Sequence, residues 1–207
     1  MDSAIQVERA EGRRVVRLAR PDKANALTRT MLGELADTVE AATRTGDRVL
    51  VLTARGGVFS AGMDLAEAYT GLATDPVWER LSAAVAAFPG LSIAALNGTV
   101  AGGALGMVLA CDLRIAVEGT RAFYPVMKLG FLPQPSDPGR LVRLVGPARA
   151  RVMLMGGARV DAAEALSWGL FDRVVPPSDL WPTVGSLAAD TLAADPAHAA
   201  AIKRMTL

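Results

Sequence analysis

The chain has 207 residues, of which 51% are hydrophobic and 21% are charged. It is therefore too apolar to be disordered and too charged to be a multi-span membrane protein, and it is long enough to build one globular core. The net charge of +1 gives no strong surface field, which argues against nucleic-acid binding. The single cysteine, Cys111, excludes an intrachain disulfide, and the single histidine, His198, excludes a histidine-rich metal site.

Predicted strands and helices alternate through the first half of the chain. The expected elements are a strand at 14–18, a turn at 20–23, a helix that Thr28 caps and that reaches Arg44, a buried strand at 48–53, a helix from Asp75-Pro76 to about Phe88, and a short strand at 92–96.

The second half continues this alternation. The expected elements are a glycine-rich turn at 98–106 that enters a helix ending near Cys111, a strand at 113–117, a proline-rich loop at 133–139, a helix from Gly146-Pro147 to Met155, a helix capped by Asp161, a short strand at 171–175, and a final helix capped by Ser178. Buried strands alternating with helices are typical of an α/β fold with crossover connections. No repeat or linker divides the chain, so residues 1–207 are expected to form a single domain.

One uncharged stretch, from Leu81 to Cys111, is long enough to cross a bilayer. Pro89-Gly90 and Asn97-Gly98 interrupt it, which favours a helix end, a buried strand and a buried helix in succession. The first ten residues carry acidic side chains and no apolar core, unlike a signal peptide. We therefore expect a cytoplasmic protein without a membrane partner.

Two loops of small residues, each following a predicted buried strand, form the candidate site. They are Phe59-Ser60-Ala61-Gly62-Met63-Asp64-Leu65 and the segment 97–104, which includes Gly102 and Gly103. Glycine allows positive φ and close backbone approach, and a backbone N–H freed at such a turn can bind a developing oxyanion. One N–H from each loop would make an oxyanion hole. The alternative is that these glycines serve only the tight packing of helix on strand.

Several short segments occur in a particular order and spacing. They are Arg20-Pro21 with Asn25-Ala26-Leu27, then 51–53, 59–65, 95–98, 102–103, 110–114, 128–130, 141–146 and 162–175. In that order they resemble the enoyl-CoA hydratase/isomerase (crotonase) family, from about residue 5 to the end. The resemblance implies a ClpP-like α/β spiral of β-β-α repeats, with two stacked sheets flanked by helices. It also implies an acyl-CoA thioester as the substrate, with coenzyme A entering as part of that substrate and no separate cofactor.

The resemblance implies a role for particular residues. The N–H groups of Met63 and Gly103 would form the oxyanion hole that polarises the thioester carbonyl and stabilises the enolate. Lys23, Ala24, Ala61, Asp64, Leu65 and Ala66 would line the coenzyme A site. Many relatives carry a lysine at the position of Ala66, so the resemblance leaves two alternatives: a phosphate contact is missing, or Lys23 replaces it. Asp64 is also suited to fixing its own loop rather than to acid–base work.

The chain departs from its relatives where hydratases carry two glutamates that activate water. Those positions are Gly106 and Val126, and a third acidic position used by other relatives aligns with Gln134. Proton transfer by a positioned side chain is worth about a hundred- to ten-thousand-fold, so hydration by the usual route should be nearly abolished.

Three other groups are candidates for the missing acid or base, each with a structural alternative. Asp137 would be a catalytic carboxylate or a loop cap, at a position where relatives usually have glycine. Tyr124 would donate a hydrogen bond or pack in the core, and Glu67 would face the acyl channel or solvent. Cys111 is expected to be a packed small apolar residue, and His198 a surface residue.

Three functional hypotheses follow. The first is an acyl-CoA-processing lyase or isomerase; the second is a catalytically silent acyl-CoA binding protein; the third is a structural relative that serves a protein partner. The family implies a homo-oligomer, a trimer or hexamer. The chain stops near Leu207, where relatives continue into helices that cover the site and build the trimer, so we expect those C-terminal helices to be missing or truncated.

Overall fold

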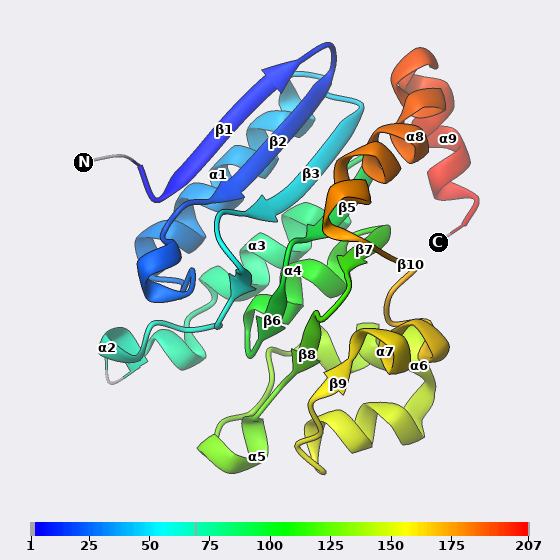
Figure 1. Ribbon diagram of the computed structural model, residues 1–207. Coiled ribbons are helices and arrows are strands. Elements are labelled where there is room, and N and C mark those ends of the chain that lie inside the picture. Colours follow the sequence, from blue (N-terminus) through cyan, green and yellow to red (C-terminus); the bar gives the residue numbers. More distant parts are fainter. Residues whose placement is uncertain (1–2, 69, 207) are drawn as a thin grey trace.

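The computed structural model describes residues 3–68 and 70–206, which fold into two β-sheets with helices around them (Figure 1). The larger sheet has the strand order β1-β2-β3-β5-β7-β10 and the smaller one the order β4-β6-β8-β9. The large-sheet strands are β1 (Ile5–Ala10), β2 (Arg13–Leu18), β3 (Val49–Ala54), β5 (Leu91–Leu96), β7 (Leu113–Val117) and β10 (Arg173–Val175). The small-sheet strands are β4 (Val58–Ser60), β6 (Thr99–Ala101), β8 (Arg121–Phe123) and β9 (Val160–Asp161).

The chain winds as a spiral between the two sheets. Three times a strand of the large sheet is followed at once by a short strand of the small sheet and then by helix: β3–β4, β5–β6 and β7–β8. These successive strands pair in parallel within each sheet, whereas β1 and β9 pair antiparallel at the edges. The expected α/β fold of β-β-α repeats with two stacked sheets is confirmed.

Helices cover both faces of the large sheet. The helices of the described chain are α1 (Arg29–Arg44), α2 (Leu65–Ala68), α3 (Val77–Ala86), α4 (Ala104–Ala110), α5 (Val126–Leu129), α6 (Asp137–Leu154), α7 (Ala162–Trp168), α8 (Leu180–Ala193) and α9 (Pro196–Arg204). Alternate residues of β3 face opposite sides: Leu50 and Leu52 join the core under α1, α3 and α4, whereas Val49 and Val51 pack under α8. All six residues of β3 are buried, as its unbroken apolar run predicts.

Three local predictions need correction. The strand β1 was not expected, because its alternation is masked by exposed polar residues. Residues 133–139 are not all loop: α6 already begins at Asp137 and is kinked at Gly146, where φ is +79°. Ser178 does not cap the last helix; it lies in a 3-10 turn before α8, and Asp195 caps the further helix α9 through the N–H groups of Ala197 and His198.

The uncharged stretch from Leu81 to Cys111 forms the end of α3, the strands β5 and β6, and α4, as the interrupting turns indicated. Within the described residues, no helix combines the length and the apolar run needed to cross a membrane.

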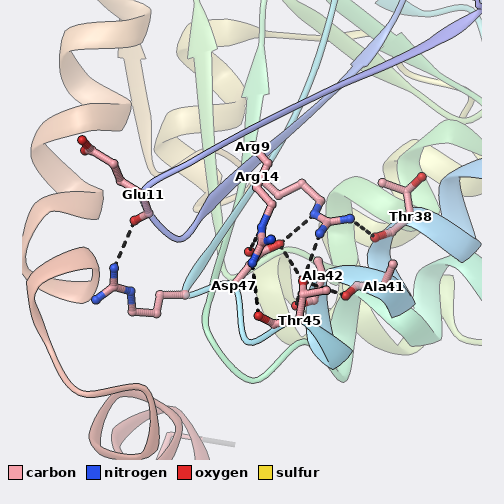
Figure 2. Close-up of polar contacts among 9 residues, drawn as sticks. Arg9, Glu11, Arg14, Thr38, Ala41, Ala42, Thr45 and Asp47 are labelled. Atoms are coloured by element: carbon pink, nitrogen blue, oxygen red, sulfur yellow. Dashed lines mark hydrogen bonds and ion pairs between the residues drawn. The ribbon is translucent and has the colours of Figure 1, made fainter.

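A buried ion-pair cluster fastens the β1–β2 hairpin to the C-terminal end of α1 (Figure 2). Asp47 is 3% exposed and binds the Nε atoms of Arg9 and Arg14, each at 2.7 Å. Arg14, itself buried, also donates to the Thr45 hydroxyl at 3.0 Å. The cluster supplies hydrogen bonds to both charges, which is the condition for burying an ion pair without a large desolvation loss.

We predict that Asp47→Ala lowers the free energy of unfolding by about 3 to 5 kcal/mol, because it leaves Arg14 buried without its counter-charge. Urea unfolding measures the loss. The matched control is Arg80→Ala, which removes exposed pairs to Asp37 and Glu40 and should cost less than about 1 kcal/mol. Losses of equal size in the two variants would contradict this account of the cluster.

Candidate active site

The two glycine loops predicted from the sequence touch each other. Gly62 has a φ of +91°, and a Cβ placed on it would lie 2.8 Å from the Ala101 carbonyl oxygen and 3.4 Å from the Gly102 Cα. Gly102 also has positive φ, at +57°. A side chain at position 62 would therefore force the loops apart, and only glycine allows both this backbone conformation and this approach.

The first loop is held so that the Met63 N–H points away from its neighbours. Leu27 bridges this loop by donating its N–H to the Gly62 carbonyl at 2.7 Å and accepting from the Asp64 N–H at 2.9 Å. In such a bridge, the N–H of the residue between the two contacts faces the opposite side. Among the described residues, no acceptor lies within hydrogen-bond reach of the Met63 nitrogen.

The second loop leads into α4 through Gly103. The Gly102 N–H donates to the Phe123 carbonyl at 3.0 Å, which ties the loop to β8. Gly103 has φ and ψ of −59° and −19° and precedes the first residue of α4, so its N–H is one of those that a helix start leaves without an internal partner. Over the ranges 3–68 and 70–206, no acceptor is found for this N–H.

A largely apolar cavity lies beside both loops and is lined by Met63 and Gly103. The residues around it include no charged side chain; they are Ala61, Met63, Leu65, Ala73, Trp78, Gly102, Gly103, Tyr124, Pro125, Val126, Leu129, Phe131, Leu132 and Gln134. Sequence reasoning missed Trp78, whose ring lies 3.0 to 3.2 Å from the position of a Cβ on Gly103. Only the three-dimensional packing of α3 against α4 brings that ring to the loop.

Of the residues predicted to form the site, Ala61, Met63, Leu65 and Gly103 line this cavity. Lys23, Ala24, Asp64 and Ala66 do not line it, although they lie on neighbouring segments. The Ala61 N–H donates to the Ala24 carbonyl at 2.9 Å, so the turn at 23–24 lies beside the first loop.

Asp64 is engaged within its own region of the fold. Its carboxylate binds Arg20 at 2.5 Å and accepts from the Ala66 N–H at 2.9 Å. The hydrogen bond from Arg20, followed by that from Ala66, lowers the pKa of Asp64 below its ordinary value. Asp64 is therefore a carboxylate that shapes the entry to α2.

Among the other residues considered from the sequence, Val126 lines the cavity, whereas Glu67, Cys111 and His198 do not. Glu67 accepts from the Arg29 N–H at 2.8 Å, at the start of α1, rather than facing the cavity. Cys111 is buried, and burial raises its thiol pKa to about 12. His198 is exposed on α9, and Val126 stands in the cavity wall.

Asp137 and Tyr124 form a buried pair next to the cavity. Asp137 is 1% exposed at the first turn of α6, and its Oδ2 accepts from the Tyr124 hydroxyl at 2.9 Å. A Cβ on Gly106 would lie 2.9 Å from the Asp137 Oδ1, so the carboxylate fills the space beside α4 that a side chain at 106 would need. In the sequence, positions 106 and 137 both differ from the residues that relatives usually carry there. The structure shows that these two positions are in contact.

Burial changes the acid–base properties of this pair. It raises the pKa of Asp137 to about 6, against a smaller opposing effect of the Tyr124 hydrogen bond and the Arg140 charge. Burial also raises the pKa of Tyr124, and the neighbouring Asp137 charge adds to that shift. The tyrosine is therefore the proton donor of the pair, and the carboxyl is the group that titrates nearer neutrality.

Fold and site together define an α/β protein in which two glycine loops, carrying Met63 and Gly103, line one apolar cavity. The family model for enoyl-CoA hydratase/isomerase matches residues 8–206, and the chain belongs to this family. YngF of Bacillus subtilis is 38% identical over 91% of this chain and 75% of its own length. The 4-chlorobenzoyl coenzyme A dehalogenase-2 of an Arthrobacter species is 37% identical, over 95% of this chain and 75% of its own length. The solved structure of Pseudomonas aeruginosa DspI superposes with a TM-score of 0.91 and 31% identity, covering 99% of this chain and 86% of that one.

We predict that the Asp137 carboxyl makes stability depend on pH. Its folded pKa, about 6, lies above its ordinary value of 3.8, so the native state keeps a proton that the unfolded chain has lost. This stabilisation is complete below about pH 4 and is lost as the pH rises through about 6. Asp137→Asn should therefore gain about 1 to 3 kcal/mol relative to the wild type on going from pH 4 to pH 8.

Urea unfolding of both proteins at the two pH values measures this difference. The exposed carboxylate of Asp179 provides a control, since Asp179→Asn should behave as the wild type does at both pH values. An Asp137→Asn effect that is the same at pH 4 and pH 8 would contradict the raised pKa.

Proposed function

We propose that the protein binds an acyl-CoA thioester and stabilises the enolate of its acyl group, with the N–H groups of Met63 and Gly103 as the oxyanion hole. One observation carries the proposal: Met63 and Gly103 line the same cavity, and neither N–H has an acceptor among the described residues. Donors fixed before the reaction are effective because they need no reorganisation as negative charge develops on the carbonyl oxygen.

The walls of the cavity support an apolar acyl group as the part of the substrate that enters it. Trp78, Phe131 and Leu132 contribute side chains, and the polar groups present are those of Tyr124 and Gln134. The coenzyme A portion would lie toward the exposed Leu65 and Ala66, with the exposed Lys23 on the neighbouring turn as a cation for its phosphates. This placement agrees with the coenzyme A thioester named for the Arthrobacter relatives.

A silent acyl-CoA binding protein is the second candidate. It is favoured by the absence of a carboxylate at Gly106 and at Val126, which borders the cavity with an apolar side chain. The two candidates share the oxyanion hole and differ in turnover, so binding and product formation must be measured on the same samples of saturated, enoyl, 3-hydroxy and aryl acyl-CoAs.

We predict that Gly103→Pro weakens the binding of an enolate-like acyl-CoA analogue at least tenfold more than that of free coenzyme A. The proline removes the N–H donor, and an interaction made with developing charge is lost chiefly by ligands that mimic that charge. Gly103→Ala is the matched control, because it retains the N–H while its Cβ meets the Trp78 ring in the same way. Calorimetric titration of both variants decides: a loss that is equal for the two ligands, or equal in the two variants, would argue against the oxyanion role.

A further inference from the structure

We propose that Tyr124 and Asp137 form the proton-transfer pair of this site, with Tyr124 contacting the acyl group and Asp137 acting through it. The inference rests on the proposed function and assigns to it the acid–base group that the family positions 106 and 126 do not supply. It arises from a contact between three elements: the segment after β8, the first turn of α6, and α4.

Tyr124 has the position required of the group that touches substrate. It borders the cavity that Gly103 also borders, and its hydroxyl donates to Asp137 Oδ2 at 2.9 Å. The same hydroxyl oxygen accepts from the Gln134 N–H at 3.3 Å, which leaves one lone pair for a further proton. Tyr124 can thus accept a proton on one side while it gives its own to Asp137 on the other.

Asp137 stands at the end of this path and is held there from two sides. Gln134 donates its side-chain amide to the Ala73 carbonyl at 3.0 Å. Ser136 binds the Glu79 carboxylate of α3 through its N–H at 3.0 Å and its hydroxyl at 2.6 Å. The loop that carries Asp137 is therefore fixed before any ligand arrives, as a proton-transfer geometry requires.

The environment of Asp137 Oδ1 indicates that this carboxylate does more than cap a helix. Oδ1 is buried and has no hydrogen-bond partner among the described residues, and the nearest cation, Arg140 Nη1, lies 3.9 Å away. A buried carboxylate oxygen left without a partner is costly to stability, and that cost falls when the carboxyl group takes up a proton, here at Oδ2 from Tyr124.

Gly106 makes this arrangement possible. Residues 103 and 106 are three apart along α4 and so lie on one face of it, about one turn from each other. Because a Cβ at 106 would lie 2.9 Å from Oδ1 and 3.2 Å from Oδ2, the glycine leaves room for the carboxylate one turn from the Gly103 donor. The acidic group enters from α6 instead of from α4.

The step balances without any further reactant. A C–H bond next to the thioester carbonyl breaks, its proton passes to Tyr124 Oη, and the tyrosine proton passes to Asp137 Oδ2. The electron pair moves into the enolate, whose oxygen is held by the N–H groups of Met63 and Gly103. The protons on the Tyr124–Asp137 pair then exchange with solvent water, and return of a proton by the same path regenerates the thioester with a solvent hydrogen at the α-carbon, so the minimal reaction is reversible exchange of the α-hydrogen.

The charged groups around Asp137 determine the pH range in which its carboxyl is ionised and can accept the tyrosine proton. Arg140 on α6 favours the ionised form, Glu79 on α3 disfavours it, and α4 presents no titratable side chain. Asp137 must be ionised to accept the tyrosine proton, and burial raises its pKa to about 6. The exchange rate should therefore rise as the pH increases through about 6.

The test follows α-deuterium incorporation into butanoyl-CoA and phenylacetyl-CoA in D2O by mass spectrometry, with binding of each thioester measured in parallel. Tyr124→Phe and Asp137→Asn should each slow exchange by about a hundredfold or more while changing the thioester Kd less than about threefold. The pH rise near 6 should be absent in Asp137→Asn. Asp179→Asn, an exposed carboxylate far along the chain, should exchange as the wild type does.

A relocated carboxylate separates proton transfer from support of the loop. In Gly106→Asp combined with Asp137→Gly, the new side chain starts from a Cβ that lies beside the old carboxylate, so exchange should recover at least tenfold over Asp137→Gly alone. A folded double variant that recovers nothing would place Asp137 as a loop support and overturn the inference.

The remaining outcomes separate this inference from the function on which it rests. If the wild type binds the thioesters but exchanges no deuterium, the proton-transfer pair is overturned and the silent binding protein is favoured. If Tyr124→Phe and Asp137→Asn exchange at the wild-type rate, the pair is likewise overturned while the oxyanion hole stands. If the wild type binds neither thioester, the proposed function itself fails.

Discussion

The site depends on the contact between two backbones at Gly62 and Gly102. The same strand pair is closed at its other end by Gly98, where a Cβ would lie 2.1 Å from the Gly57 carbonyl oxygen. Glycines at both ends thus let β4 and β6 run closer together than side chains would permit. The residues that follow Gly62 and Gly102, namely Met63 and Gly103, both line one cavity. Separate loops would place these two donors independently, whereas loops in contact fix them together.

The spiral of the fold explains why acid–base groups can reach this cavity from different elements. Each turn adds a strand to both sheets, so the segments after β4, β6 and β8 end on neighbouring positions of the small sheet. The donors come from the first two segments, and Tyr124 follows the third. Asp137 enters from α6, which packs on α4. The proposed proton-transfer pair uses this property: Asp137 occupies the space beside Gly106 from α6, while the loops that carry Met63 and Gly103 are unchanged.

The sequence predicted those features that depend on local pattern or on the order of motifs. It predicted the buried strand β3, the Thr28 and Asp161 caps and the two glycine loops, because each of these features depends on residues that are close together in the chain. It did not predict β1, the early start of α6 or the Asp195 cap, where exposed polar residues or proline obscure the periodicity. It also could not place Trp78 on Gly103 or Asp137 against Gly106, since these contacts join elements that only the tertiary packing brings together.

The central claim is that two backbone donors polarise a bound thioester, and the carbonyl itself can report this most directly. The measurement is the isotope-edited infrared difference spectrum of an acyl-CoA labelled with ¹³C at the thioester carbonyl, free and bound. Hydrogen bonds from Met63 and Gly103 draw electron density onto the oxygen and weaken the C=O bond. The account predicts that the labelled stretch moves to lower wavenumber on binding. Binding of the thioester is established separately by displacement of a bound ligand. If the thioester is bound and its carbonyl stretch stays at the solution frequency, the claim that Met63 and Gly103 polarise the carbonyl is contradicted.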